Sequence, residues 1–479
     1  MKRILIHTLI FSPDGVSTAY LYNDIALKLK EMGYDVVVLT TTPHFNIVPE
    51  QVGKQPMRWK VWGVCKVSDF HGIKVLHVPQ KKFKSAALRL LGFLYWHIVS
   101  FFLGLTIKHV DLILSPSPPL TIGYLNLMLA RLKGCKVVYN VQEIYPDILQ
   151  LKDGFVLKAL KGLERRVYNG SDAVTTIDQV FYDTIVGRFE DKTKLHIIPN
   201  FVDTELYHEV YVECRDESLE FFLRFASKAS QLAERRDSGE LKEDSGQEFK
   251  RPRIGELENT TSKGSENSKL ATDSKHYTLN AQLFPNTDSI KLLYAGNIGH
   301  AQSWEPMIAL AERTREMAVE YFVIGEGARR DYVAGEIERL KLEKVHLLEY
   351  QPRELMPAIL SYSDASFIFM DPASDGNGFP SKVYTIMACE RPMLILSGEN
   401  TPIVNFLKGK GCAKLITNKN FDEKVEEMVD WLAHTDREKL REMGRKGLEV
   451  IEKGYTKERV TRMYGELVGS LCSPQITQM

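Results

Sequence analysis

Residues 290–299 read Ile-Lys-Leu-Leu-Tyr-Ala-Gly-Asn-Ile-Gly, and this stretch decides the fold class. Its first six residues are almost continuously apolar, as expected of a strand covered on both faces of a sheet. Gly296 and Gly299 then mark a turn into a segment with helical spacing around Met307 and Leu310. The order of strand, glycine turn and helix is that of a βαβ unit, which predicts a parallel sheet.

Similar short apolar runs recur along most of the chain and alternate with segments of helical spacing. They occur at 4–10, 36–41, 75–78, 112–114, 137–141, 174–177 and 195–198, and again at 290–295, 321–324, 345–348, 366–370, 393–396 and 413–416. Two such series predict an α/β protein with two doubly wound, Rossmann-like domains.

The domain boundaries follow from this pattern. We expect an N-terminal domain over 1–205, a C-terminal domain over 288–455, and a helix over 456–479 that returns toward the N-terminal domain. Between the domains, residues 208–286 form an insertion. Its segment 236–275 holds 17 charged residues and one aromatic residue, Phe249. Such a segment cannot bury enough apolar surface to offset its ordering entropy, so we expect disorder there.

Composition excludes several classes of protein. The 479 residues include 62 Lys+Arg and 62 Asp+Glu, and zero formal net charge argues against a nucleic-acid-coating protein. The six cysteines form no Cys-x-x-Cys pair and none has zinc spacing to a histidine. We therefore expect reduced thiols, no metal and a cytoplasmic location. Residues 1–7 enter a strand directly, without the long apolar core of a signal peptide.

Residues 54–107 combine a basic stretch with an apolar one. Nine basic residues face one acid, Asp69, between Lys54 and Arg89, and residues 88–107 are then almost uninterruptedly apolar. We favour a helix that lies on an anionic membrane surface. A buried core helix is the main alternative. A transmembrane helix is disfavoured, because strand-like runs of one domain lie on both sides of it.

Three further loops that follow predicted strands carry binding chemistry. Gly15 lies in the loop that opens the first helix, and Gly325 and Gly327 follow the strand at 321–324. Arg330 stands where a dinucleotide fingerprint needs a third glycine, which disfavours a nicotinamide dehydrogenase and suits a mononucleotide diphosphate. Lys382 begins a helix after the strand at 366–370, where its charge would stabilise a phosphate.

These motifs resemble those of GT-B glycosyltransferases of family 4. The chain most resembles the branch of L-fucosamine transferases of O-antigen synthesis and colanic-acid glycosyltransferases. The matching stretches are 11–20, 137–151, 198–207, 294–302, 323–330 and 378–392. Pro-Ser-Lys-x-Tyr at 380–384 together with Ala-Gly-Asn-x-Gly at 295–299 carries most of the likeness.

The resemblance implies two facing Rossmann-like domains with the donor between them. It implies sugar transfer with retention of anomeric configuration, without metal or cofactor, from a UDP- or GDP-sugar to a lipid-linked or glycan acceptor. The product would be a cell-surface polysaccharide such as an O-antigen or a capsule. The protein would then lie on the cytoplasmic, inner face of the cell membrane as a peripheral protein, with no nucleic-acid partner.

The resemblance also assigns roles to residues of this chain. Glu143 and Lys382 would be catalytic. The donor would contact Gly15, Asn297, Gly299, Gln302, Gly325, Gly327, Arg329, Asn377, Ser381 and Thr385. Many family members have two glutamates where Asn377 and Thr385 stand, and Glu390 replaces a usually small residue. No metal ligands are implied.

Two other functions share these features. A catalytically weak partner subunit of a polysaccharide assembly complex would explain the missing carboxylates at Asn377 and Thr385. A nucleotide-sugar epimerase could use the same fold, but it would need no lipid acceptor, so residues 54–107 argue against it. Turnover with a panel of nucleotide-sugars separates the transferase from the partner subunit.

Overall fold

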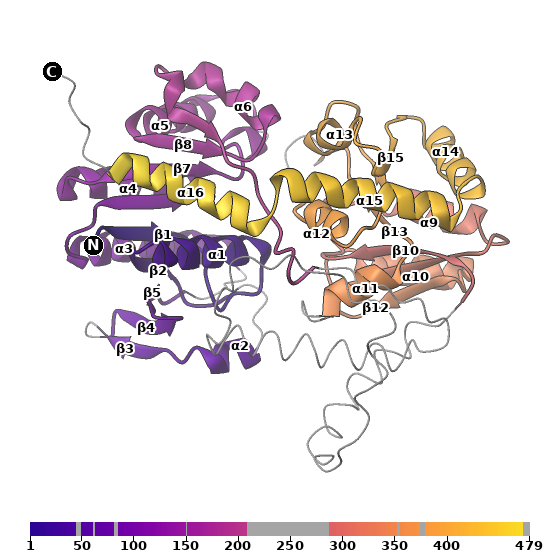
Figure 1. Cartoon of the computed structure of the whole chain (residues 1–479), viewed down its shortest axis with the longest axis horizontal. Coiled ribbons are helices and arrows are strands. Elements are labelled where there is room, and N and C mark those ends of the chain that lie inside the picture. Colours follow the sequence, from indigo (N-terminus) through magenta and orange to yellow (C-terminus); the bar gives the residue numbers. More distant parts are fainter. Residues whose placement is uncertain are drawn as a thin grey trace, which may run out of the picture.

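The computed structural model describes residues 1–44, 49–60, 63–80, 85–149, 151–207, 287–351, 355–373 and 379–472. Two parallel-sheet α/β domains lie side by side (Figure 1). The predicted fold class is therefore confirmed. The insertion at 208–286, with its predicted disorder, lies outside the described residues.

The N-terminal sheet has the strand order β3-β4-β5-β2-β1-β6-β7-β8-β9. The strands are β1 Arg3–His7, β2 Asp35–Thr41, β3 Arg58–Lys60, β4 Cys65–Phe70, β5 Ile73–Val78, β6 Leu112–Pro116, β7 Lys136–Val141, β8 Ala173–Thr176 and β9 Leu195–Ile197. All neighbours pair in parallel except β3 with β4 and β4 with β5, which are antiparallel. The apolar run predicted over 4–10 is too long, since β1 ends at His7 and the chain turns toward the first helix.

Helices cover both faces of this sheet. They are α1 Ser17–Glu31, α2 Pro49–Lys54, α3 Ala86–Thr106, α4 Leu120–Lys133, α5 Phe155–Gly170 and α6 Gln179–Ile185, with short 3-10 turns at Asp147–Leu149, Val186–Arg188 and Lys192–Lys194. Alternate residues of β2 divide between the faces: Val36 and Val38 pack toward α1, whereas Val37 and Leu39 pack toward α3 and α4. The alternation is what both-sided burial of a parallel strand requires.

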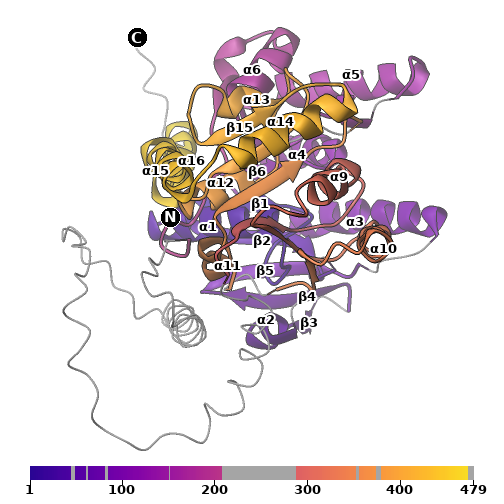
Figure 2. The same cartoon turned by 90° about the vertical axis from the view of Figure 1, so that its right-hand side faces the viewer.

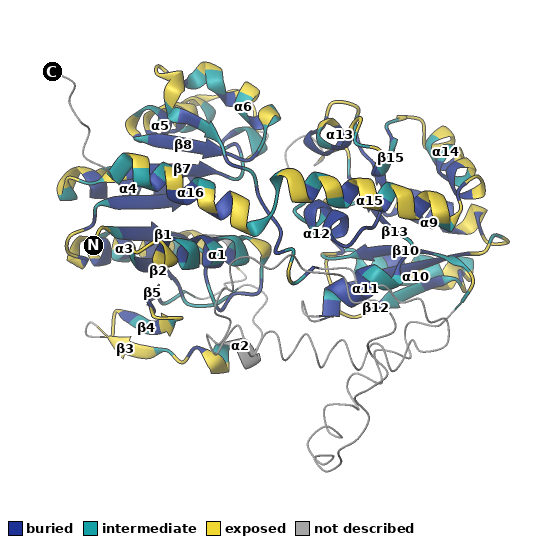
Figure 3. Cartoon of the chain, in the orientation of Figure 1, coloured by how far each residue is buried: buried dark blue, intermediate teal, exposed yellow. Residues whose placement is uncertain are grey.

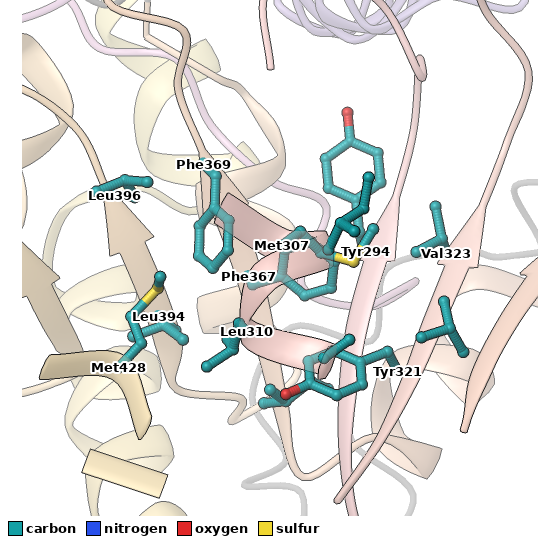
Figure 4. Packing of buried hydrophobic residues seen from close by; sticks show 14 of the residues in the cluster. Tyr294, Met307, Leu310, Tyr321, Val323, Phe367, Phe369, Leu394, Leu396 and Met428 are labelled. Atoms are coloured by element: carbon teal, nitrogen blue, oxygen red, sulfur yellow. The ribbon is translucent and has the colours of Figure 1, made fainter. Parts of the chain in front are cut away.

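The C-terminal sheet is entirely parallel, with the order β12-β11-β10-β13-β14-β15. Its strands are β10 Ile290–Ala295, β11 Val319–Ile324, β12 Val345–Leu348, β13 Ala365–Phe369, β14 Met393–Leu396 and β15 Ala413–Ile416. Its helices are α9 Glu305–Arg313, α10 Arg330–Leu340, α11 Met356–Tyr362, α12 Lys382–Ala388, α13 Pro402–Leu407, α14 Phe421–Ala433 and α15 Arg437–Gly454. On one face, side chains of α9 and α14 interlock with Tyr294, Tyr321 and Phe367 (Figure 4).

The last helix, α16 Lys457–Cys472, leaves the C-terminal domain and packs on the N-terminal one beside α1 (Figure 1). Its Tyr464 hydroxyl accepts a hydrogen bond of 2.9 Å from the amide of Asn140, which is fully buried at the end of β7. The same amide group also bonds Tyr22, Gln142 and Thr175. This satisfied polar cluster fixes α16 to the edge of the sheet from which the functional loops leave.

Candidate functional site

Three loops meet at the carboxyl edge of the C-terminal sheet, after β10, β11 and β13. The amide of Ile298 donates to the carbonyl of Glu326 at 2.8 Å, and that of Arg329 donates to the carbonyl of Ile298 at 2.9 Å. The amide of Ser303 donates to Phe369 at 2.8 Å. The backbone itself therefore holds the first loop between the other two, at the edge where parallel sheets bind ligands.

Two glycines allow this close approach. Gly325 has a φ of +141°, and a Cβ atom there would overlap the carbonyl group of Gly296. Gly327 has a φ of +158°, and a Cβ atom there would overlap the carbonyl group of Ile298. Both positions combine a backbone conformation that L residues rarely adopt with a lack of space, so any side chain would force the loops apart.

Lys382 is the first residue of α12, and its side chain extends to the place where these loops come together. Its Nζ lies 3.9 Å from the centroid of the Tyr294 ring, and only 2.6 Å from where a Cβ atom on Gly296 would stand. The Tyr294 hydroxyl donates to the carbonyl of Asn297 at 2.6 Å, which fixes the ring. Gly296 therefore leaves the space that the ammonium group occupies.

Burial lowers the pKa of Lys382 to about 7. Within the described ranges no carboxylate forms an ion pair with this ammonium group, which lies over the face of the Tyr294 ring. A cation held in that way would interact favourably with any anion that binds beside it, and it could stabilise negative charge that builds up on a leaving group.

Gln302 adds an unsatisfied polar atom to the same loops. Its Nε2 donates to the Ala301 carbonyl at 3.2 Å, while its Oε1 is buried without a hydrogen-bond partner among the described residues. A buried acceptor of this kind suits a ligand hydroxyl.

The other residues predicted to bind the sugar donor differ in the contacts that they make in the structure. The guanidinium carbon of Arg329 lies 3.9 Å from the centroid of the Tyr332 ring, and the guanidinium group forms a salt bridge with Glu305. Its positive charge therefore already has a partner within the protein. The Thr385 hydroxyl donates to the carbonyl of Lys382 at 2.9 Å. Ser381 precedes α12 without a capping hydrogen bond from its side chain, and the Gly299 carbonyl accepts from Trp304. Asn377 lies outside the described residues.

The N-terminal candidates lie on loops after β1 and β7. Gly15 is buried next to Asp14, whose carboxylate accepts a bond of 2.9 Å from the amide of His44. Glu143 is half-buried, and burial raises the pKa of its carboxyl group against the opposing effect of a hydrogen bond with Tyr145. A raised pKa suits a group that exchanges a proton with a substrate hydroxyl.

Phe379 joins the two domains and was not found from the sequence. It packs against the N-terminal cluster that contains Ile144, and its ring also lies 5.2 Å from that of Tyr384 in the C-terminal core. Ile144 directly follows Glu143, and Phe379 is three residues before Lys382. Phe379 therefore connects the loop that precedes Lys382 to a hydrophobic cluster of the N-terminal domain. An aromatic residue just before Pro-Ser-Lys was the available signal.

No group of three or more histidine, cysteine or acidic side chains is placed to hold a metal ion in the part of the chain that the structure describes.

Comparison with known proteins agrees with this architecture. The family described as Glycosyltransferase Family 4 matches residues 19–206, and Glycosyl transferases group 1 matches residues 278–449, so together they cover well over half of the chain. A protein of Escherichia coli (strain K12), described as the colanic acid biosynthesis glycosyl transferase WcaI, is 20% identical over 406 residues, 81% of either chain.

Solved structures share the fold at low sequence identity. The sucrose-phosphate synthase of Thermosynechococcus elongatus gives a TM-score of 0.65 at 12% identity, covering 98% of this chain and 99% of that one. Alr3699/HepE of Anabaena, solved in complex with UDP-glucose, gives a TM-score of 0.61 at 12% identity, covering 98% and 100%.

The close contact between the glycine loops can be tested by its effect on thermal stability. Gly325→Ala should lower the melting temperature by several degrees, because strain and overlap of this kind cost about 1–3 kcal/mol. Gly335→Ala is the matched control: Gly335 lies in α10 with open space around it, so alanine there should be neutral or stabilising. Equal melting temperatures for the two variants would contradict the assigned role of Gly325.

Proposed function

The chain is a GT-B glycosyltransferase of the family 4 type, and on that premise we propose that it moves a sugar from a nucleoside-diphosphate sugar to a lipid-linked or glycan acceptor. The observation that carries the proposal is the position of Lys382 above Tyr294, beside two glycine loops with close backbone contact. Glycine loops and a cation with no carboxylate partner among the described residues suit a diphosphate. The UDP-glucose complex of HepE, a protein of the same fold, supports this donor class.

The chemistry follows from the charges that change. The bond between the anomeric carbon and the departing phosphate oxygen breaks, and an acceptor hydroxyl oxygen forms the new bond to that carbon. The proton of that hydroxyl passes to the departing diphosphate, which balances the step. Negative charge grows on the diphosphate, where protonated Lys382 would stabilise it. Glu143, with a raised pKa, would bind the acceptor hydroxyl or the sugar. We propose retention of configuration and no cofactor, as in the family branch that the sequence resembles.

The acceptor and the location complete the proposal. The likeness to a colanic acid glycosyl transferase supports a role in cell-surface polysaccharide synthesis, such as an O-antigen or a capsule. An acceptor on a lipid would place the enzyme at the cytoplasmic face of the membrane, as a peripheral protein. The exposed apolar side chains of α3 support this location. They contrast with the strands of the same domain, which are mostly buried (Figure 3).

A weakly active partner subunit is the competing proposal. The observation in its favour is Thr385, whose hydroxyl is bonded to the Lys382 carbonyl in a position where many family members have a glutamate. Turnover measured with UDP-, GDP- and ADP-sugars separates the two: an active enzyme excludes the subunit proposal.

Thermal melting tests donor binding. UDP or GDP at 100 times its dissociation constant should stabilise the native protein by about 2.7 kcal/mol, seen as a rise in melting temperature. ADP and free phosphate are the controls. If none of the nucleoside diphosphates raises the melting temperature at millimolar concentration, the proposed donor class is wrong.

Substitution of Lys382 tests its role in turnover. Lys382→Ala should lower turnover by about 10²–10³, by analogy with other preorganised groups that stabilise transition-state charge, and should leave the fold intact. Lys410→Ala is the matched control, because the Lys410 ammonium also lies over an aromatic ring, that of Phe406, at 4.5 Å. Near-normal turnover of Lys382→Ala with saturating donor would remove its assigned role.

The charge of Lys382 should make donor binding depend on pH. Free Lys382, with a pKa of about 7, is largely protonated below that pH and neutral above it. Because the bound diphosphate favours the protonated form, affinity for UDP should fall by up to tenfold per pH unit between pH 7 and 9. Calorimetric titration of wild type and Lys382→Arg checks this, since arginine stays charged over this range. A flat profile for the wild-type protein would count against the assignment.

A further inference from the structure

Helix α3 shows one buried side and one apolar, exposed side. Trp96, Ser100 and Leu103 are buried against the sheet and α4, whereas the opposite side projects into solvent. The exposed large side chains are Leu88, Leu90, Leu91, Leu94, Tyr95, Ile98, Phe102 and Leu105. The 19 residues Leu88–Thr106 are long and apolar enough to cross a membrane, and 22% of that segment's apolar window is buried. The core-helix alternative would need most of it to be buried.

The packing of α3 argues that it lies along the domain and does not span a membrane. It connects β5 to β6, and both strands belong to the same sheet. Its His97 Nε2 forms a 2.9 Å hydrogen bond with the Thr121 hydroxyl of α4, and His97 Nδ1 with the Phe93 carbonyl. Withdrawing the helix into a bilayer would break these contacts and open the core around Trp96.

Helix α5 is much richer in charge than α3, whose basic residues are Arg89 and the histidine His97. At its start, Phe155 and Val156 are 87% and 62% exposed. The exposed side chains that follow are mostly basic, namely Lys158, Lys161, Arg165 and Arg166. The acid within the helix, Glu164, is buried and paired with Arg188. Exposed aromatic and aliphatic residues followed by basic ones are typical of a helix that binds anionic lipid.

The two helices belong to one face of the protein. Helix α4 lies between α3 and α5 and contacts both on the same side of the sheet. Figure 2 shows α3 and α5 projecting beyond the sheet on the same side, opposite to α15 and α16. Their exposed ends therefore can reach one flat partner at the same time.

We propose that α3 and α5 together form a docking surface for an anionic lipid bilayer, with the apolar side of α3 in the acyl boundary and the basic side of α5 on the headgroups. Charge complementarity selects this occupant, because a bilayer offers an apolar layer next to a layer of negative charge. This rests on the proposed lipid-linked acceptor. Glu143 lies on the loop that leads to α5, so docking would hold it at a fixed height above the membrane.

In this proposal the basic residues that bind the membrane lie on α5. The sequence pattern indicates the stretch between Lys54 and Arg89 as their source, and Lys81, Lys82 and Lys84 of that stretch lie outside the described residues. The basic side of α5 was missed because, read along the chain, its charges alternate with apolar residues as in any exposed helix. Only the fold brings α5 next to α3.

The test is co-sedimentation of the full chain with vesicles of phosphatidylcholine, alone or with about one third phosphatidylglycerol. Lys158→Glu with Arg165→Glu and Arg166→Glu should weaken binding to the anionic vesicles by about tenfold or more. Leu91→Asn with Leu94→Asn should leave only binding that high salt removes. Lys439→Glu with Arg441→Glu and Arg445→Glu, three exposed charges on α15, is the matched control and should keep wild-type affinity.

UDP-dependent melting is measured on every variant and should be unchanged, since none of these residues lies at the donor loops. Equal losses in the α5 and α15 variants, or wild-type protein that ignores anionic vesicles at low salt, would overturn the docking proposal. So would self-association in solution that buries α3. Wild-type protein that ignores vesicles but responds to UDP contradicts the docking surface alone, whereas protein that does not respond to UDP contradicts the proposed function.

Discussion

The contact between the backbone at Gly325 and the carbonyl group of Gly296 is the constraint on which the site depends. It draws the loops after β10 and β11 together, and the space left above Gly296 is the space that Lys382 fills. A cation there is enclosed by the Tyr294 ring and by peptide groups, so it loses hydration without gaining a described counter-ion. The anion-binding property of the site is therefore a result of backbone geometry as much as of one lysine.

The N-terminal domain takes part through few contacts. Phe379 packs against the cluster beside Glu143, and α16 returns to the N-terminal sheet, where Tyr464 meets Asn140. The two segments that connect the domains also form backbone hydrogen bonds with each other. The amide of Val202 donates to the carbonyl of Tyr455, and the amide of Lys457 donates to the carbonyl of Val202, at 3.0 Å each. A shift between the domains would thus act, through Phe379, on the loop that precedes Lys382.

Much of the fold could be predicted from residues because both sheets are buried on both faces. Every predicted apolar run overlaps a strand, and Gly325 and Gly327 stand where the loops need them. The hairpin of β3 and β4 was missed, since Arg58 and Lys66 interrupt any apolar run. Contacts between distant segments, such as that of Phe379 with the N-terminal cluster, have no local pattern. The pairing of Arg329 with Glu305 also could not be read from spacing, because the two residues are 24 positions apart.

A crystal structure of the protein with bound UDP would test directly whether Lys382 and the glycine loops form the diphosphate site. In that structure the diphosphate oxygens should lie within ion-pair distance of Lys382 Nζ, against the loops that carry Gly296 and Gly327. A diphosphate bound away from these loops, while Lys382 keeps the Tyr294 ring as its neighbour, would contradict this assignment.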